Sequence, residues 1–166
     1  MLYLKTTLES DPGTMEIETP EFGCTCARLR KVTRRITRVY DAQLAAQGIK
    51  TTQYSLMVNA AAAPRMVSDL AAIMDMERTT LTRNLRALVK QGWLSHGVGR
   101  DLRTRVVSIT PAGRRKLAAA KPYWRAAQLQ VEALLGDRFV GTLHDQIDTA
   151  LLQLPFAPPS LEGETA

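Results

Sequence analysis

The sequence predicts a mainly α-helical fold that carries one small β-hairpin, and three observations predict it. Apolar residues recur at helical spacing through most of 26–154, and glycines and prolines separate the periodic segments. Two short β-type runs flank a polar, glycine-containing loop at 97–104. The chain has 166 residues, of which 45% are hydrophobic and 23% charged. It is therefore long enough to form one compact domain with extra helices, and needs no disulfide or metal to fold.

The first two predicted helices have clear ends. Apolar residues recur every three to four positions over 26–47, and Gly48 ends this helix. The second helix begins at Thr51, which we expect to be its N-cap, and ends at residue 63 because Pro64 follows. The core side of this second helix comprises Tyr54, Leu56, Met57 and Ala60.

A short helix, a longer helix and the hairpin come next. The apolar segment 66–74 predicts the short helix. A second helical pattern follows and ends at Gly92; its apolar side consists of Leu81, Leu85 and Leu88. The runs 93–96 and 105–109 then predict the two strands of the hairpin.

Two more helices complete the predicted fold. Thr110 followed by Pro111 is a favourable helix start, and the helix continues to residue 135 with Pro122 inside it. Gly136 breaks the pattern, and a last helix runs to about residue 154. This order of elements is that of a winged helix-turn-helix with helices added at both ends.

The positive charge lies in the middle of the chain. Residues 1–27 carry a balance of −4, residues 28–105 carry +10, and residues 106–166 are neutral, which together give the net charge of +6. A basic centre between acidic and neutral ends favours a polyanionic partner, most often nucleic acid. Aromatic residues make up only 5% of the chain, which argues against a stacking platform for single strands.

The helix that follows residue 77 has the two faces that a recognition helix needs. Its leucines can pack against the preceding short helix, while polar and basic side chains face outward. Arginine binds guanine edges through two hydrogen bonds, and threonine contacts phosphates or the thymine methyl. The candidate DNA-contacting residues on this helix are Arg78, Thr79, Thr80, Thr82, Arg83 and Arg86.

The hairpin adds a second basic cluster, formed by Arg100, Arg103 and Arg105. Extended arginines on a narrow loop suit a minor groove, whose negative potential deepens as it narrows. A winged helix touches DNA with its recognition helix and its wing, and the sequence places one cluster in each. The alternative for either cluster alone is a solvated charged surface.

These segments resemble the multiple-antibiotic-resistance regulator (MarR) family over about residues 25–154. The resemblance rests on the run from Leu70 to Leu94 and on the wing Asp101-Leu102-Arg103 followed by Ile109-Thr110-Pro111-Ala112-Gly113. It implies a homodimer that binds a palindromic operator, usually as a repressor released by a small ligand or an oxidant. It also implies that Arg103 is the wing-tip arginine, that Asp101 orients it, and that the first and last helices with part of the fifth form the dimer interface.

Two residues depart from the family pattern. Glu77 stands where aspartate often precedes the recognition helix, and glutamate is the weaker N-cap. Asp75 occupies a turn where glycine is common, and its charge near phosphates would lower affinity for DNA.

Further residues are candidates for regulation. Cys24 and Cys26 are either thiols that sense an oxidant or cysteines packed against apolar neighbours. Arg28 and Arg35, seven residues apart on one helix face, are candidate carboxylate binders among arginines that are otherwise solvated. Four residues could line an effector pocket or pack in the core: Tyr54, Met57, Tyr123 and Trp124.

Catalysis and cofactor binding have no support in the sequence. The two histidines, His96 and His144, lie on separate elements without metal-ligand spacing, and no nucleophile or phosphate-loop motif is present. We expect no catalytic residue, cofactor or metal. No apolar run is long enough for a bilayer and the N-terminus lacks a secretion signal, so we expect a cytoplasmic protein without a membrane partner.

The sequence thus predicts a regulator that forms a homodimer, binds double-stranded DNA and binds a small-molecule effector. Redox sensing through the cysteines, and a winged helix that contacts only proteins, are the alternatives. The predicted organisation is an arm at 1–20, a DNA-binding domain at 51–110, dimerisation helices at 21–50 and 111–154, and a tail at 155–166.

Overall fold

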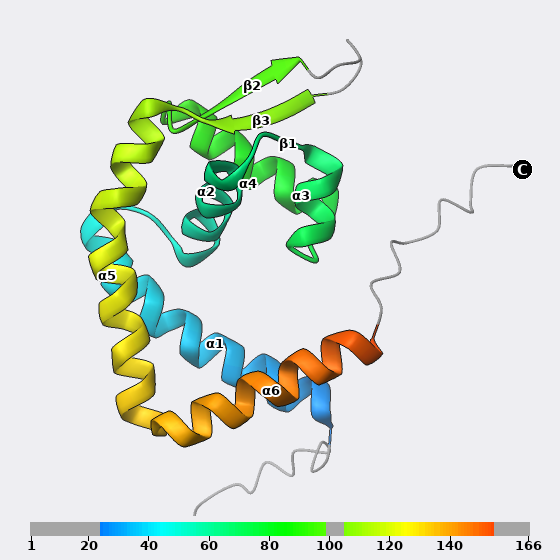
Figure 1. Cartoon of the computed structure of the whole chain (residues 1–166), viewed down its shortest axis with the longest axis vertical. Helices are drawn as coiled ribbons and strands as arrows, with labels where there is room; N and C mark the ends of the chain where they lie inside the picture. Colours follow the sequence, from blue (N-terminus) through cyan, green and yellow to red (C-terminus); the bar gives the residue numbers. More distant parts are fainter. Residues whose placement is uncertain (1–23, 99–104, 155–166) are drawn as a thin grey trace, which may run out of the picture.

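The computed structural model describes residues 24–98 and 105–154. A long helix connects a lobe of short helices and strands to two further helices, one from each end of the chain (Figure 1). The elements in chain order are α1 (Thr25–Leu44), the 3-10 turn η1 (Ala45–Gln47), α2 (Thr51–Ala62), β1 (Arg65–Met66), α3 (Val67–Ile73), α4 (Arg78–Lys90), β2 (Leu94–Val98), β3 (Arg105–Ile109), α5 (Pro111–Leu135) and α6 (Asp137–Gln153).

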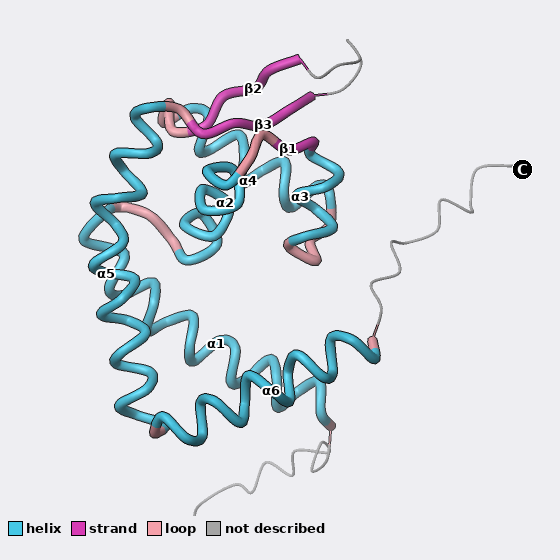
Figure 2. Tube along the Cα trace, viewed as in Figure 1, coloured by secondary structure: helices cyan, strands magenta, loops and turns pink. Residues whose placement is uncertain are grey.

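This is the predicted winged helix fold, mainly helical with a small antiparallel sheet (Figure 2). The helix pattern predicted over 26–47 forms α1 and η1, and Gly48 ends it in the left-handed conformation with φ 62°. α5 runs through Pro122, as expected, and α6 follows the break at Gly136. The predicted arm at 1–20 and tail at 155–166 lie outside the described residues.

One local prediction was wrong, and one strand was missed. Thr51 is the first residue of α2 rather than its N-cap, which is Lys50. The Thr51 hydroxyl instead donates a hydrogen bond to the carboxylate of Asp41, over 2.7 Å, and so fastens α2 to α1. The two-residue strand β1 was not predicted. Its pairing of Arg65 with Val107 makes the sheet three-stranded, in the order β1-β3-β2.

The core consists of two clusters that meet at Trp93 and Leu117. The larger cluster lies within the lobe of α2, α3, α4 and the sheet, and it includes the predicted core residues Leu56, Met57 and Ala60. The smaller cluster joins α1, α2 and α5 through Leu44, Ile49, Tyr54 and Ala120. Shared contacts with Trp93 and Leu117 therefore couple the lobe to the long helix.

Thr110 fixes the start of α5 against the lobe. Its hydroxyl accepts the N–H of Gly113 at 3.0 Å, as expected of an N-cap, and donates to the carbonyl of Gly92 at 2.6 Å. One side chain thus joins the end of β3, the turn after α4 and the first turn of α5.

Candidate nucleic-acid interface

α4 has the two faces that its sequence predicts. Leu81, Leu85 and Leu88 are buried in the larger core cluster. Glu77 is the N-cap residue but its side chain makes no capping hydrogen bond. Core packing rather than capping therefore holds this helix in place.

The polar face of α4 is open to solvent. Five of the six candidate side chains are exposed: Arg78, Thr79, Thr80, Arg83 and Arg86. Thr82 is half-buried, and its hydroxyl donates to the carbonyl of Arg78 at 2.7 Å. Its hydroxyl oxygen and methyl group remain for a ligand. Five of the six candidate residues line a shallow depression of about 430 Å³: Arg78, Thr79, Thr82, Arg83 and Arg86.

A larger groove of about 800 Å³ runs beside α4. Three of its lining residues come from the segment that contains β1 and the start of α3, namely Met66, Val67 and Ser68, and His96 comes from β2. The α4 side supplies Arg78, Thr82, Leu85, Arg86, Val89 and Lys90. The groove lining therefore combines apolar side chains with the cations Arg78, Arg86 and Lys90, a combination suited to a sugar-phosphate backbone.

Sequence reasoning missed several of these groove residues. Lys90 follows Arg86 by four positions, so helical spacing could have placed it on the same face. Neither His96 nor Ser68 carries a sequence signal that places it at this groove. Both come to the groove through the tertiary fold, because β2 and β1 pair with opposite edges of β3.

The predicted wing contact falls mainly outside the described residues. Arg100, Asp101 and Arg103 belong to the segment 99–104, of which nothing is described. Arg105 begins β3 and its backbone pairs with that of Val98, the last residue of β2. The two strands thus lead directly into the arginine-rich loop.

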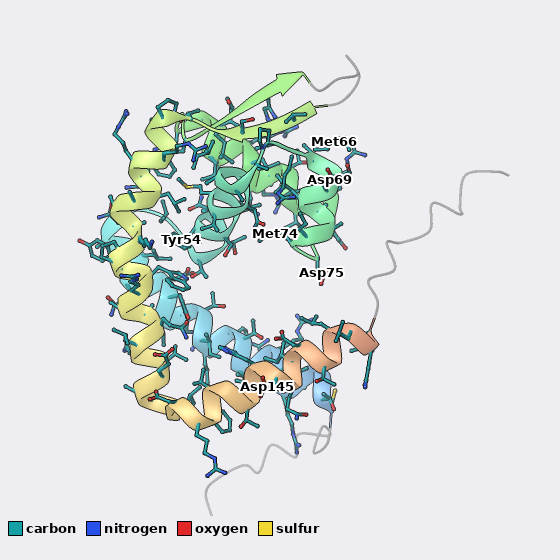
Figure 3. The ribbon with its side chains drawn as sticks, in the orientation of Figure 1. Tyr54, Met66, Asp69, Met74, Asp75 and Asp145 are labelled. Atoms are coloured by element: carbon teal, nitrogen blue, oxygen red, sulfur yellow. The ribbon has the colours of Figure 1, made fainter. Side chains whose placement is uncertain are left out.

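Three of the candidate effector residues meet where α1, α2 and α5 pack together. The rings of Tyr54 and Trp124 stack with centroids 5.9 Å apart, and Tyr123 packs against the same cluster. Figure 3 shows Tyr54 on the side of α2 that faces α5. Burial raises the pKa of Tyr54, and the nearby charge of Arg125 opposes that rise. Met57, by contrast, belongs to the larger core cluster.

Tyr40 extends this aromatic cluster along α1. Its ring lies 6.3 Å from that of Trp124, and its hydroxyl donates to the side chain of Gln128 on α5. Burial and the charge of Glu132 both raise its pKa. Arg28 and Arg35 are exposed on the first half of α1, whereas the cluster contacts the second half.

Cys24 and Cys26 are both free and exposed in the single chain. Cys24 is the N-cap of α1, and its sulfur accepts the N–H of Ala27 at 3.5 Å. A depression of about 360 Å³ is lined by both thiol-bearing residues together with Ala27, Arg30 and Arg34.

No group of three or more histidine, cysteine or acidic residues that could hold a metal occurs in 24–98 or 105–154. None of the helices in this part of the chain is long and apolar enough to cross a membrane.

Comparison with known proteins places this architecture in a family. No protein-family model matches the sequence, and no curated protein does. Among solved structures, the M. tuberculosis transcriptional regulator MosR in complex with DNA is 32% identical, with a TM-score of 0.63. The match covers 77% of this chain and 98% of MosR. The chain belongs to the MarR family of transcriptional regulators.

Two further MarR-type structures share the fold. A variant of MarR from E. coli, complexed with operator DNA, is 20% identical with a TM-score of 0.71, over 80% of this chain and 94% of that one. The transcriptional repressor CouR, bound to a 23-mer DNA duplex, is 22% identical with a TM-score of 0.71, over 76% and 92%. As a MarR-family member, the chain is a transcriptional regulator rather than an enzyme.

Proposed function

We propose that this MarR-family chain is a homodimeric repressor that binds a palindromic operator in double-stranded DNA. The observation that carries the proposal is α4, which buries three leucines and exposes Arg78, Arg83 and Arg86 beside a groove whose lining includes cations. An exposed basic face on a rigidly packed helix fits the major groove. Structures of MosR, MarR and CouR each contain DNA, and this supports the same assignment.

The DNA-binding domain in this proposal is 51–110, and the dimerisation helices are 21–50 and 111–154. Exposed large apolar residues concentrate on the second region: Leu29, Val32, Leu129, Leu134, Leu135, Phe139, Ile147, Leu151, Leu152 and Leu154. So much exposed apolar surface on three helices calls for a partner. A two-fold dimer would cover it and would place two copies of α4 about one DNA turn, roughly 34 Å, apart.

Release by a small molecule is the regulatory part of the proposal. The stacked pair Tyr54 and Trp124 lies between α1, α2 and α5, and this cluster meets the DNA-binding lobe at Trp93 and Leu117. An aromatic ligand could replace one ring of the stack, and Arg125 is a cation close enough to attract an anionic group. Separating the rings would shift α5 against the lobe and so change the spacing of the two recognition helices.

The test is selection of bound duplexes from a randomised DNA pool at near-physiological salt, followed by sequencing. We expect an inverted repeat whose half-site centres lie about ten base pairs apart. A pool that stays random would overturn the proposal. Binding that falls steeply with salt would then indicate charge-driven contact without sequence preference, and absence of duplex binding would favour a protein partner on the basic face.

A redox switch is a second candidate, favoured by the exposure of Cys24 and Cys26 beside Arg30 and Arg34. The thiolate of one cysteine would attack a hydroperoxide, whose O–O bond breaks to leave a sulfenic acid and an alcohol. The second thiol would then displace water and form a disulfide. The disulfide would disturb the first turn of α1, because Cys24 is its N-cap and Cys26 lies inside it.

Stoichiometric hydroperoxide followed by operator-binding measurements tests this candidate. We expect loss of binding in the parent chain, recovery with a thiol reductant, and no response in Cys24→Ser and Cys26→Ser chains. Oxidised parent protein that binds its operator as before would contradict the switch. Serine is a favourable N-cap, so Cys24→Ser should keep the start of α1.

A further inference from the structure

The first half of α1 has a cationic face on the side away from its apolar residues. Leu29 and Val32, which are 51% and 44% exposed, mark the apolar side. The face on the opposite side, at about 100° per residue, consists of four exposed cations: Arg30, Lys31, Arg34 and Arg38. A partner that covers the apolar side therefore leaves this cationic face of α1 open to solvent.

α1 itself offers the cationic face no free carboxylate. Asp41 is the only acid in residues 25–44. Its carboxylate accepts hydrogen bonds from the N–H and the hydroxyl of Thr51, each over 2.7 Å. Neighbouring cations on one helix face repel one another, so an anionic partner would stabilise this part of α1.

The cationic face lies far from the candidate DNA interface. In Figure 1 the first half of α1 is at the end of the molecule opposite to the sheet and α4. A duplex bound along α4 therefore leaves these cations without a partner.

The chain contains an acidic segment directly before α1, outside the described residues. Residues 1–23 contain five acids and one lysine, and three of the acids lie within 16–21: Glu16, Glu18 and Glu21. In an extended chain, Glu16 and Glu18 would point to one side because only Ile17 separates them. Pro20 favours an extended conformation at the residue before it.

The length of this segment matches that of the cationic face. Arg38 follows Cys24, the N-cap of α1, by fourteen residues, or about 21 Å of helix. Glu16 precedes Cys24 by eight residues, which span at most about 26–29 Å when extended. A chain that turns back at the start of α1 can therefore bring Glu16 to Arg38 and place Glu21 near Arg30.

We propose that the acidic segment 16–21 folds back onto the cationic face of its own α1. Its attachment to α1 gives the segment a high effective concentration there, so several surface ion pairs, each of them weak, hold it together. The docked segment neutralises a face that otherwise attracts polyanions without sequence preference. This contact goes beyond the proposed function and does not depend on it.

Zero-length coupling with a carbodiimide tests the contact, because Lys31 is the only amine on the cationic face. The reagent forms an amide between the Nζ of Lys31 and a carboxylate that touches it, and takes up the water as a urea. Peptide mass spectrometry of the full chain, coupled at low salt, should show Lys31 joined to Glu16, Glu18 or Glu21. Absence of these products would overturn the proposal.

Charge-matched variants separate docking from mere nearness in the chain. Arg30→Gln with Arg34→Gln weakens the face but keeps Lys31, so the yield of coupled product should fall at least about tenfold. Arg114→Gln with Arg115→Gln removes the same charge from exposed positions on α5 and should leave the yield within about threefold. Equal yields in all three chains would contradict docking on the cationic face. Circular dichroism confirms that the variants stay helical.

Isotope labelling identifies the chain that supplies the segment. Labelled and unlabelled chains are mixed, allowed to exchange subunits and then coupled. We expect both halves of each product to carry the same label. Products that combine the two labels would show that the segment comes from a second copy, and would overturn docking within one chain. The coupling measurements contain no DNA, so failure of the proposed function would not affect them.

Heparin binding tests the neutralisation of the face. A chain with Glu16→Gln, Glu18→Gln and Glu21→Gln should bind immobilised heparin at least about threefold more tightly than the parent chain at fixed salt. Adding Arg30→Gln and Arg34→Gln should cancel this gain. A gain that persists would come from total charge alone, and would overturn the shielding of the cationic face.

Discussion

Gly113 lies directly against the carbonyl of Trp93, at the point where the long helix α5 leaves the DNA-binding lobe. A Cβ at position 113 would overlap that carbonyl oxygen and would lie 2.8 Å from Cγ1 of Ile109. The same carbonyl accepts the N–H of Thr110 at 3.0 Å. A contact that only glycine permits therefore holds together the end of the wing, the turn after α4 and the start of α5.

Gly113→Ala should lower the free energy of unfolding by about 3 kcal/mol, because backbone atoms must move to admit one methyl group. Urea unfolding followed by circular dichroism measures the change. Gly141→Ala is the matched control, since Gly141 lies inside α6 with open space around it. There, alanine should raise stability by up to about 1 kcal/mol through helix propensity. Equal responses at the two positions would contradict the close packing at Gly113.

Asp75 is the only non-glycine residue with positive φ in the described ranges, at 45°, in the turn between α3 and α4. Asp75→Gly should raise stability by about 0.5–1 kcal/mol because glycine adopts this conformation without the clash of a Cβ. It should also tighten DNA binding, because it removes a negative charge from the turn that leads into α4.

Asp75→Asn separates the two effects. Asparagine removes the charge but keeps a side chain, so binding should tighten as in Asp75→Gly while the urea midpoint changes less. Binding measured at low and high salt provides the readout, since a charge effect shrinks with screening. Equal stability of the parent, Asn and Gly chains would contradict a strained turn.

The helices could be predicted from sequence because their information is local. Leu81, Leu85 and Leu88 repeat at helical spacing, and Gly48 and Gly92 take the left-handed conformation that ends a helix. These signals need no knowledge of the rest of the fold. The N-cap at Thr110 was equally predictable, because its partner, the N–H of Gly113, is three residues away.

The errors concern contacts between distant segments. Thr51 resembled an N-cap, but its hydroxyl bonds Asp41, ten residues earlier. The strand β1 has only two residues and pairs with β3, some forty positions later. In the groove, Ser68 and His96 join Arg78 only because the sheet brings three segments together. Helical periodicity carries no information about contacts between distant segments. It therefore predicts α4, the helix of the candidate site, but not the groove residues that come from other segments.

Arg83 is central on the exposed face of α4, so Arg83→Ala should weaken operator binding by about 1–3 kcal/mol and relax base preference at one position. Repeating the duplex selection with the variant measures both. Arg138→Ala removes the same charge from α6 and should leave the selected sequence unchanged. If base preference survives in Arg83→Ala while affinity falls, Arg83 contacts phosphate rather than a base edge.

The wing gives a separate prediction. Arg103→Ala should weaken operator binding by about 1–3 kcal/mol, because the variant lacks the arginine that would bind in the negative potential of a narrow minor groove. Asp101→Ala should act in the same direction if the carboxylate orients Arg103. Operator affinity is measured by fluorescence anisotropy at fixed salt. Unchanged affinity in Arg103→Ala would remove the wing from the interface.

Tyr54 makes stability depend on pH in the alkaline range. Burial raises its pKa above the ordinary value of 10.0, with Arg125 acting in the opposite direction. Between the pKa of the unfolded chain and the higher pKa of the folded chain, the folded state binds more protons. The free energy of unfolding should therefore fall as pH rises past about 10, and the contribution of Tyr54 is complete below that pH.

Tyr54→Phe keeps the ring stacked on Trp124 and removes the titrating group. Its stability should fall less than that of the parent chain between about pH 9 and pH 11, as measured by urea unfolding at each pH. Tyr40→Phe should act in the same direction, because burial and Glu132 raise the pKa of Tyr40. The control is Tyr123→Phe, which removes a hydroxyl beside the same cluster. A parent chain and a Tyr54→Phe chain with identical pH profiles would show that the Tyr54 hydroxyl is ionised as easily in the folded state as in the unfolded one.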